Sequence, residues 1–137
     1  MTPTRYISSN EIGHLCIYLT TKDRMPPTKG WLSFLPRRSL AQHIINLAKR
    51  NGILNATSHS THYGFTGGGE IETIQPDHGN GRLSMFVELV GEREKLEKFV
   101  CIHETLLKDK IIVYKHLEQW TVRNHATEAR ELTGIKE

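Results

Sequence analysis

The spacing of apolar residues switches along this chain between the period of a strand and that of a helix, and the order of the switches limits the possible folds. Apolar and polar residues alternate in segments 14–21, 82–91 and 110–122, as in strands with one buried face. Segments 39–52 and 92–107 instead repeat their apolar residues at helical spacing. The pattern predicts two helices interleaved with strands.

A further segment, residues 53–64, is rich in β-branched and small residues and is predicted to be a strand, although it is polar on both faces. Asn55, Thr57 and His59 fall on one side of it. Because it has so little apolar surface, we expect it to face a cleft or a neighbouring subunit. The full order is then β-α-β-β-α-β, which predicts a ferredoxin-like α+β fold. In that fold two helices cover one face of an antiparallel four-stranded sheet.

Local signals delimit the first helix. Ser39 and Gln42 have the spacing of a capping box at its start, and Gly52 is expected to end it. The preceding residues 22–36 are predicted to form a long loop with exposed aromatic side chains. The residues after the last strand, 123–137, are charged and are predicted to be a short helix or a disordered tail.

Composition favours a single soluble domain. With 137 residues, of which 37% are hydrophobic and 24% charged, we expect one domain over residues 1–137, with a core at about 12–123 and flexible tails. No apolar run approaches the length of a membrane helix and no signal peptide is recognisable, so a cytoplasmic location is expected. Cys16 and Cys101 lie within predicted elements and are expected to be buried free thiols.

The charge balance and the missing motifs narrow the range of functions that we expect. A net charge of +3 and a pI of about 9.0 permit an anionic ligand. The sequence has no RNP-like motif, zinc-finger spacing or long basic run, so nucleic acid is not an expected partner. It also has no nucleophile elbow or evident acid pair, so no enzymatic activity is expected. A binding protein is favoured.

Residues 63–73, with the sequence YGFTGGGEIET, concentrate glycines next to an acidic, β-branched stretch. The segment matches neither the P-loop nor the dinucleotide-binding glycine motif, and it does not open a helix. Its glycines permit positive φ and allow backbone amides to turn toward an anion. A flexible hairpin loop and a ligand-contacting loop both remain open at this point.

Histidines and basic residues raise two further hypotheses. His59 and His62 suggest a metal site, but residues three apart on a strand point to opposite faces and cannot chelate one ion without a bulge. Lys108 and Lys110 lie in the turn before the fourth strand, and Arg123 closes that strand. These basic residues fit either a phosphate clamp beside the glycines or a solvated surface.

Several stretches together resemble the PII signalling superfamily, and most closely its PII-like branch. Residues 52–57, GILNAT, are similar to the segment that opens the second strand of PII proteins, and residues 64–69, GFTGGG, to the start of their T-loop. Residues 108–123 are similar to a lysine-bearing B-loop that runs into the fourth strand and ends at phosphate-binding arginines. The resemblance covers about residues 12–123.

The resemblance implies a homotrimer that binds adenine nucleotide as an effector in clefts between subunits. It also implies that the T-loop signals to a protein target, a transporter or an enzyme. The implied ligand-binding residues fall into three groups. Asn55 and Thr57 would lie by the adenine, and the T-loop base would consist of Gly64, Phe65, Gly67, Gly68 and Gly69. The phosphates would be bound by Lys108, Lys110 and Arg123.

Departures from the PII pattern shape the expected ligand. Thr66 replaces a glycine of the G-F-G motif, Thr121 takes the place of a second terminal arginine, and the glutamine–lysine pair that serves Mg-ATP is missing. Fewer phosphate contacts favour ADP or AMP. PII-like relatives are associated with bicarbonate transport and carboxysomes, which implies bicarbonate as a second ligand and a role in inorganic-carbon metabolism. The alternatives are a trimeric metal-binding protein of the copper-tolerance type, which shares this topology, and a structural domain without a ligand.

Overall fold

A computed structural model of the chain describes residues 5–25, 30–34, 36, 38–73 and 83–124. Its elements, in chain order, are β1 (Arg5–Thr20), the 3-10 helix η1 (Gly30–Phe34), α1 (Leu40–Arg50), β2 (Asn55–Ser60), β3 (Tyr63–Gly64), β4 (Glu72–Thr73), β5 (Ser84–Gly91), α2 (Arg93–Ile102), α3 (Glu104–Leu107) and β6 (Ile111–Asn124).

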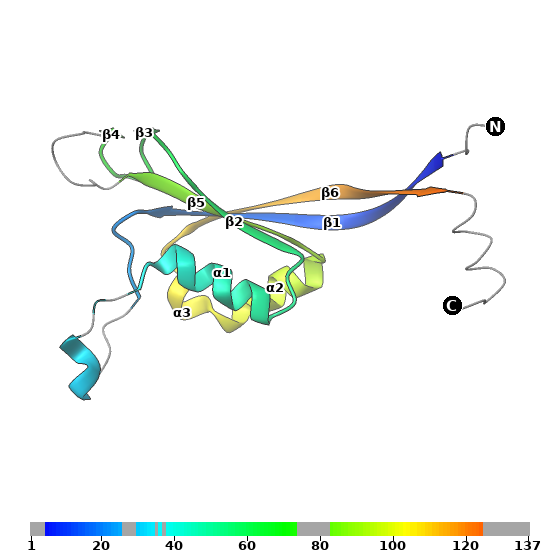
Figure 1. Cartoon of the computed structure of the whole chain (residues 1–137). Coiled ribbons are helices and arrows are strands. Elements are labelled where there is room, and N and C mark those ends of the chain that lie inside the picture. The colour runs from blue at the N-terminus through cyan, green and yellow to red at the C-terminus, as the bar shows by residue number, and fades with distance from the viewer. Residues whose placement is uncertain (1–4, 26–29, 35, 37, 74–82, 125–137) are drawn as a thin grey trace.

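The main sheet has four strands in the order β2-β5-β1-β6, and all neighbouring strands are antiparallel. The helices α1, α2 and α3 lie on one face of this sheet and leave the other face open (Figure 1). The arrangement confirms the predicted ferredoxin-like α+β fold. A separate two-stranded sheet, formed by β3 and β4, lies at one end of the main sheet.

The core lies between the main sheet and the helices, as the apolar periodicity predicts. Leu15, Ile17 and Leu19 of β1 are buried, and the register places Ile17 opposite Val87 of β5. The helices contribute further buried side chains, namely Leu40, Ala41, Ile44 and Ala48 of α1, Leu96 and Phe99 of α2, and Leu107 of α3. Odd-numbered residues of β5 and of the part of β1 that pairs with it therefore face the helices, and even-numbered residues there face the open side.

The polar strand β2 lies at an edge of the main sheet and pairs only with β5 among the described strands. Its side chains are exposed, apart from a half-buried Ala56. The edge position explains why this strand tolerates so few apolar residues, because only one of its sides pairs with another strand and its outer surface meets solvent.

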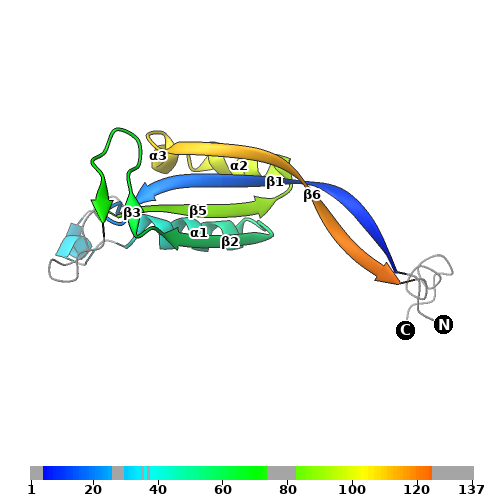
Figure 2. The same cartoon turned by 90° about the horizontal axis from the view of Figure 1, so that it is seen from above.

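The strands β1 and β6 continue beyond the rest of the sheet as a two-stranded ribbon that leads away from the β3–β4 hairpin (Figures 1 and 2). In this ribbon Ile7 pairs with Val122 and Ser9 with Trp120, so Ile7, Trp120 and Val122 share one face. All three side chains are more than half exposed. The sequence predicts β1 to begin only at His14, because the earlier residues lack an apolar face that packs on a helix.

Two local predictions differ from the structure. Ser39 is the N-cap of α1, but its side chain makes no capping hydrogen bond, so the capping-box prediction is wrong. Cys101 lies on the outer surface of α2 and is exposed, whereas Cys16 is buried as predicted. Gly52 ends α1 with a φ of 71°, in the left-handed region that glycine favours. No helix in the described part of the chain is long and apolar enough to cross a membrane.

Candidate functional site at the glycine hairpin

The glycine-rich segment forms a hairpin: Tyr63 pairs with Thr73, and Gly64 pairs with Glu72. At its turn the amide of Gly69 donates a hydrogen bond of 3.1 Å to the carbonyl oxygen of Thr66. Gly67 has a φ of 61°, which most residues adopt only with strain. The glycine spacing is thus used to close a tight turn.

One side of this hairpin lines a cavity of about 640 Å³. Two predicted ligand-binding residues, Gly68 and Gly69, lie in its wall. The other lining residues are Thr20, Lys22, Asp23, Thr66, Glu70, Glu72 and Ser84. Thr20 and Ser84 are register partners on β1 and β5, at positions that face the open side of the sheet. The cavity therefore lies where the helix-free face meets the glycine hairpin.

The turn that carries Lys110 lies beside the same hairpin. A side chain at Gly67 would place its Cβ 3.8 Å from Cδ1 of Ile111, the residue that follows Lys110. This contact brings the predicted T-loop base and the predicted phosphate-binding turn together within one chain. Lys108, at the end of α3, is exposed.

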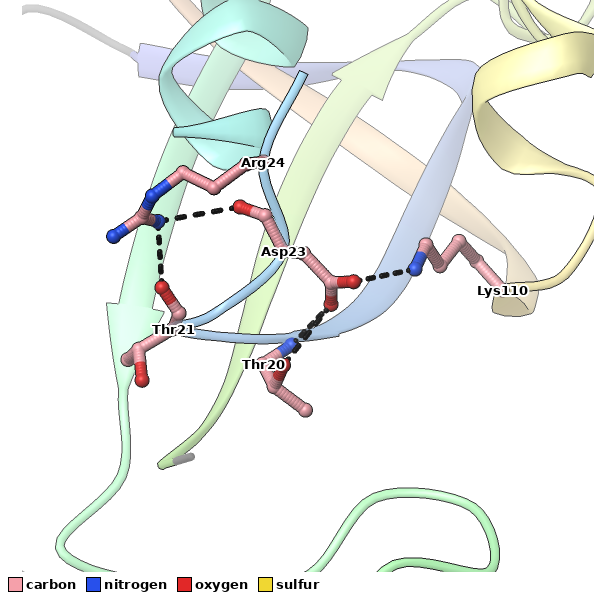
Figure 3. A network of polar contacts seen from close by, with 5 residues as sticks. All are labelled: Thr20, Thr21, Asp23, Arg24 and Lys110. Atoms are coloured by element: carbon pink, nitrogen blue, oxygen red, sulfur yellow. Dashed lines mark hydrogen bonds and ion pairs between the residues drawn. The ribbon is translucent and has the colours of Figure 1, made fainter. Parts of the chain in front are cut away.

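Lys110 is engaged by Asp23, a residue of the turn that follows β1 (Figure 3). The Lys110 Nζ donates to Asp23 Oδ1 at 2.7 Å, while the backbone amide and the hydroxyl of Thr20 donate to Asp23 Oδ2 at 2.7 Å and 3.2 Å. Burial alone would raise the pKa of Asp23, but the hydrogen bonds from Lys110 and Thr20 and the charge of Lys110 outweigh it and lower that pKa. Asp23 is therefore a strongly held carboxylate.

Two other predicted residues, Asn55 and Thr57, lie away from the cavity. Asn55 opens β2 and pairs with Val90, at the end of the strand remote from the glycine hairpin. The Thr57 hydroxyl lies 3.0 Å from Nε2 of His59. Neither residue lines the cavity, and their predicted contact with an adenine ring stays a prediction.

A cluster of histidines and a carboxylate lies on the open face near Thr57. Glu88 lies 3.6 Å from Nε2 of His14 and 3.3 Å from Nε2 of His59. His59 also stacks on Phe86 with ring centroids 4.8 Å apart. His59 thus contacts Thr57 on its own strand and Glu88 and Phe86 on β5. Among the described residues, no group of three or more metal-ligating side chains is arranged to hold a metal ion.

Arg123 lies at the far end of β6, in the ribbon, paired with Tyr6. With a strand rise of about 3.3 Å per residue, it is on the order of 40 Å from the start of β6. One chain therefore does not bring Arg123 and Lys110 together. Their joint action on one ligand requires two chains.

Sequence reasoning missed several residues of the cavity wall, above all Asp23, Thr20 and Ser84. Asp23 follows a strand and lies in a loop, a position that by itself gives no functional signal. Its partner Lys110 is 87 residues away in the chain, so only the fold reveals the pair. Glu70 and Glu72 belong to the acidic stretch after the glycines, which is recognisable in the sequence.

Comparison with known proteins identifies a family whose profile matches this chain and solved structures with a similar fold. The profile of the DUF190 family, described as "Uncharacterized ACR", matches residues 14–119. The apo form of CPII from Thiomonas intermedia K12, a nitrogen regulatory PII-like protein, superposes with a TM-score of 0.51 at 9% identity, covering 85% of this chain and 99% of that one.

A second structure of the same Thiomonas protein, bound to ADP, AMP and bicarbonate, gives a TM-score of 0.53 at 10% identity and covers 85% of this chain and 92% of that one. At this identity the likeness shows the fold. No curated protein matches the sequence significantly.

Proposed function

Because the chain belongs to the DUF190 family and has the fold of PII-like proteins, we propose that it is a non-enzymatic regulator that binds an adenine nucleotide. ADP or AMP, together with bicarbonate, is the proposed ligand set. The glycine hairpin is the proposed base of a T-loop that reports the ligand to a protein target. The observation that carries this proposal is the meeting of the glycine hairpin and the Lys110 turn near one cavity.

The chemistry of this region suits the phosphate end of a nucleotide. Gly68 and Gly69 leave backbone close to the cavity without side chains in the way, and an entering phosphate can approach it. Lys110 provides an ammonium group at the next turn. The PII-like protein from Thiomonas was solved with ADP, AMP and bicarbonate, and its likeness in fold supports the same ligand class here.

We further propose that the nucleotide site forms between subunits of a homotrimer. The cavity wall carries the carboxylates Asp23, Glu70 and Glu72 against a single lysine, Lys22. An anionic ligand needs more positive charge than this wall provides. Arg123 cannot supply it within the chain, but the ribbon of a neighbouring subunit can carry its own Arg123 to the cleft. Asn55 and Thr57 would contact the adenine from the open face.

The protein target is proposed to be a transporter or an enzyme of inorganic-carbon metabolism. The support is bicarbonate, which occupies the Thiomonas structure together with the nucleotides. A cytoplasmic protein of this kind would link the adenylate state to carbon supply.

Ligand binding is tested by thermal unfolding and calorimetric titration with ADP, AMP and ATP, with and without bicarbonate. A ligand at about 100 times its Kd should add about 2.7 kcal/mol to the free energy of unfolding. The variants Lys110→Ala and Arg123→Ala should lose this stabilisation, while Lys49→Ala, which removes an exposed lysine from α1, should retain it. Absence of stabilisation by every nucleotide would refute the proposal. Stabilisation by copper or zinc alone, lost in His59→Ala, would favour the metal-binding alternative.

A complementation experiment tests the intersubunit site. Chains carrying Lys110→Ala and chains carrying Arg123→Ala are co-refolded in equal amounts. If each site takes Lys110 from one subunit and Arg123 from the next, random assembly restores about a quarter of the ADP sites. Mixed trimers that bind no ADP, alongside a wild type that does, would contradict an intersubunit site.

A further inference from the structure

The groups that hold Asp23 form a set of donors suited to any small oxyanion. They are the Lys110 ammonium at 2.7 Å, the Thr20 backbone amide at 2.7 Å and the Thr20 hydroxyl at 3.2 Å. Ammonium groups and backbone amides are the usual donors to phosphates and carboxylates in proteins. In this chain the oxyanion that they bind is an internal carboxylate.

Part of this donor set lies at the cavity beside the glycine hairpin, and Lys110 approaches Asp23 from the neighbouring turn. Thr20 and Asp23 both line the cavity, together with Gly68 and Gly69. The side chains of Lys110 and Asp23 retain 21% and 25% of their accessible surface, so a solute can reach the pair. Ser84 is the register partner of Thr20 and extends the polar wall next to it.

One lysine cannot neutralise two anions at this position. A phosphate or carbonate that approached Lys110 with Asp23 still in place would meet a carboxylate within a few ångströms, and like charges at such distances repel strongly. Either the ligand avoids Lys110, or Asp23 leaves it. The Asp23 carboxylate is held by hydrogen bonds and by the charge of Lys110, so another oxyanion can exchange for it without any covalent bond being broken.

We propose that Lys110 and Thr20 form an oxyanion site that Asp23 occupies in the ligand-free chain, and that the anionic group of the ligand displaces the Asp23 carboxylate from it. Asp23 is then an internal competitor that sets the affinity and the selectivity of the site. Neutral ligands fail to displace it, whereas a phosphate or a bicarbonate succeeds. The inference rests on the proposed function only for the identity of the ligand.

The competition predicts that removing the Asp23 charge strengthens binding. In Asp23→Asn the amide still accepts hydrogen bonds through its oxygen, but Lys110 keeps its full charge for the ligand. We expect the ADP affinity to rise about tenfold, which corresponds to about 1.4 kcal/mol. The matched control is Asp109→Asn, which removes the same charge from the exposed residue next to Lys110. Equal tightening in both variants would mean a general charge effect and would overturn the inference.

A rescue experiment tests the oxyanion site without a nucleotide. In Asp23→Ala the donors lose their occupant, and added bicarbonate or inorganic phosphate should raise the melting temperature in a saturable way. The two anions are separate arms and distinguish a carbonate site from a phosphate site. The same anions should have no saturable effect on Asp109→Ala or on the double variant Asp23→Ala/Lys110→Ala. Rescue that persists without Lys110, or no rescue by either anion, would overturn the inference.

The two proposals fail in different ways. If ADP stabilises no variant but bicarbonate or phosphate rescues Asp23→Ala, the oxyanion site stands and the nucleotide proposal falls. If ADP binds the wild type and Asp23→Asn equally well, the nucleotide proposal stands and the role of Asp23 falls. If Asp23→Ala does not fold, the comparison of Asp23→Asn with Asp109→Asn decides alone.

Discussion

Gly13 is the residue of the sheet that should tolerate a side chain least, and Gly13→Ala tests how tightly α2 packs on β1. An added Cβ would lie 2.7 Å from Cε2 of Tyr114, 2.8 Å from Cδ1 of Leu96 and 3.0 Å from the Tyr114 hydroxyl. All three distances are below or at the limit of real carbon contacts, and Leu96 is only 1% exposed, so it has little room to move.

The magnitude follows from two opposing effects. Overpacking a well-filled site typically costs about 1–3 kcal/mol. Because Gly13 does not have a positive φ, alanine can adopt its backbone conformation and gains about 0.4–1 kcal/mol from a less flexible unfolded chain. We therefore expect Gly13→Ala to lower the free energy of unfolding by about 1–2 kcal/mol, measured by urea unfolding followed by circular dichroism.

The control is the residue directly across the sheet. Gly91 pairs with Gly13, but a Cβ there meets its nearest atoms, in Ile53 and Leu54, at 3.7 Å, an ordinary contact. Gly91→Ala should leave stability unchanged or raise it slightly. In a Tyr114→Ala background, which removes two of the three crowded atoms, Gly13→Ala should cost less by a coupling energy of at least about 0.5 kcal/mol. A Gly13→Ala variant as stable as the wild type would refute the packing argument.

Two further predictions concern single side chains. Burial, and the charges of His103, Arg38 and Arg50, lower the pKa of His43 below its usual value of 6.5, so the unfolded chain binds this proton more readily than the folded chain. The contribution of neutral His43 to the free energy of unfolding is therefore complete above pH 6.5 and is lost as the pH falls. Urea unfolding at several pH values should show a weaker loss of stability in His43→Gln. Cys101 should react with a thiol reagent in the folded protein, whereas Cys16 should react only on unfolding. Cys16→Ser leaves only Cys101 to react and Cys101→Ser leaves only Cys16, so equal reaction rates of the two folded variants would contradict the assigned exposures.

The fold was predictable because local periodicity and global packing agree. Leu15, Ile17 and Leu19 alternate in the sequence and are buried together in the structure, and the helical stripe that begins at Leu40 packs above them. The ribbon was not predictable in this way. Its residues pack against no helix of the described part of the chain, so their periodicity carries no signal of a buried face, although pairing between Ile7 and Val122 extends both strands.

The candidate site was predictable only in part. The glycines and the basic turn are recognisable in the sequence, because glycine content and lysine position are local properties. The engagement of Lys110 by Asp23 depends on the fold bringing the end of β1 to the start of β6. Arg123 is far from Lys110 because β6 is long. The sequence predicts that both residues flank one strand, but it does not show that the strand keeps them too far apart to share a site.

The two edges of the main sheet differ in a way that bears on how copies of the chain can associate. The β2 edge is short and lined with polar side chains, whereas the β6 edge is long and exposes Val113, Leu117 and Trp120. Growth into a fibre by strand addition needs a receptive edge on both sides of every copy. A short polar edge is one of the devices by which proteins discourage unintended strand addition. The contrast between the two edges therefore disfavours open-ended aggregation through β2, and leaves β6 as the edge with more apolar surface for a neighbour.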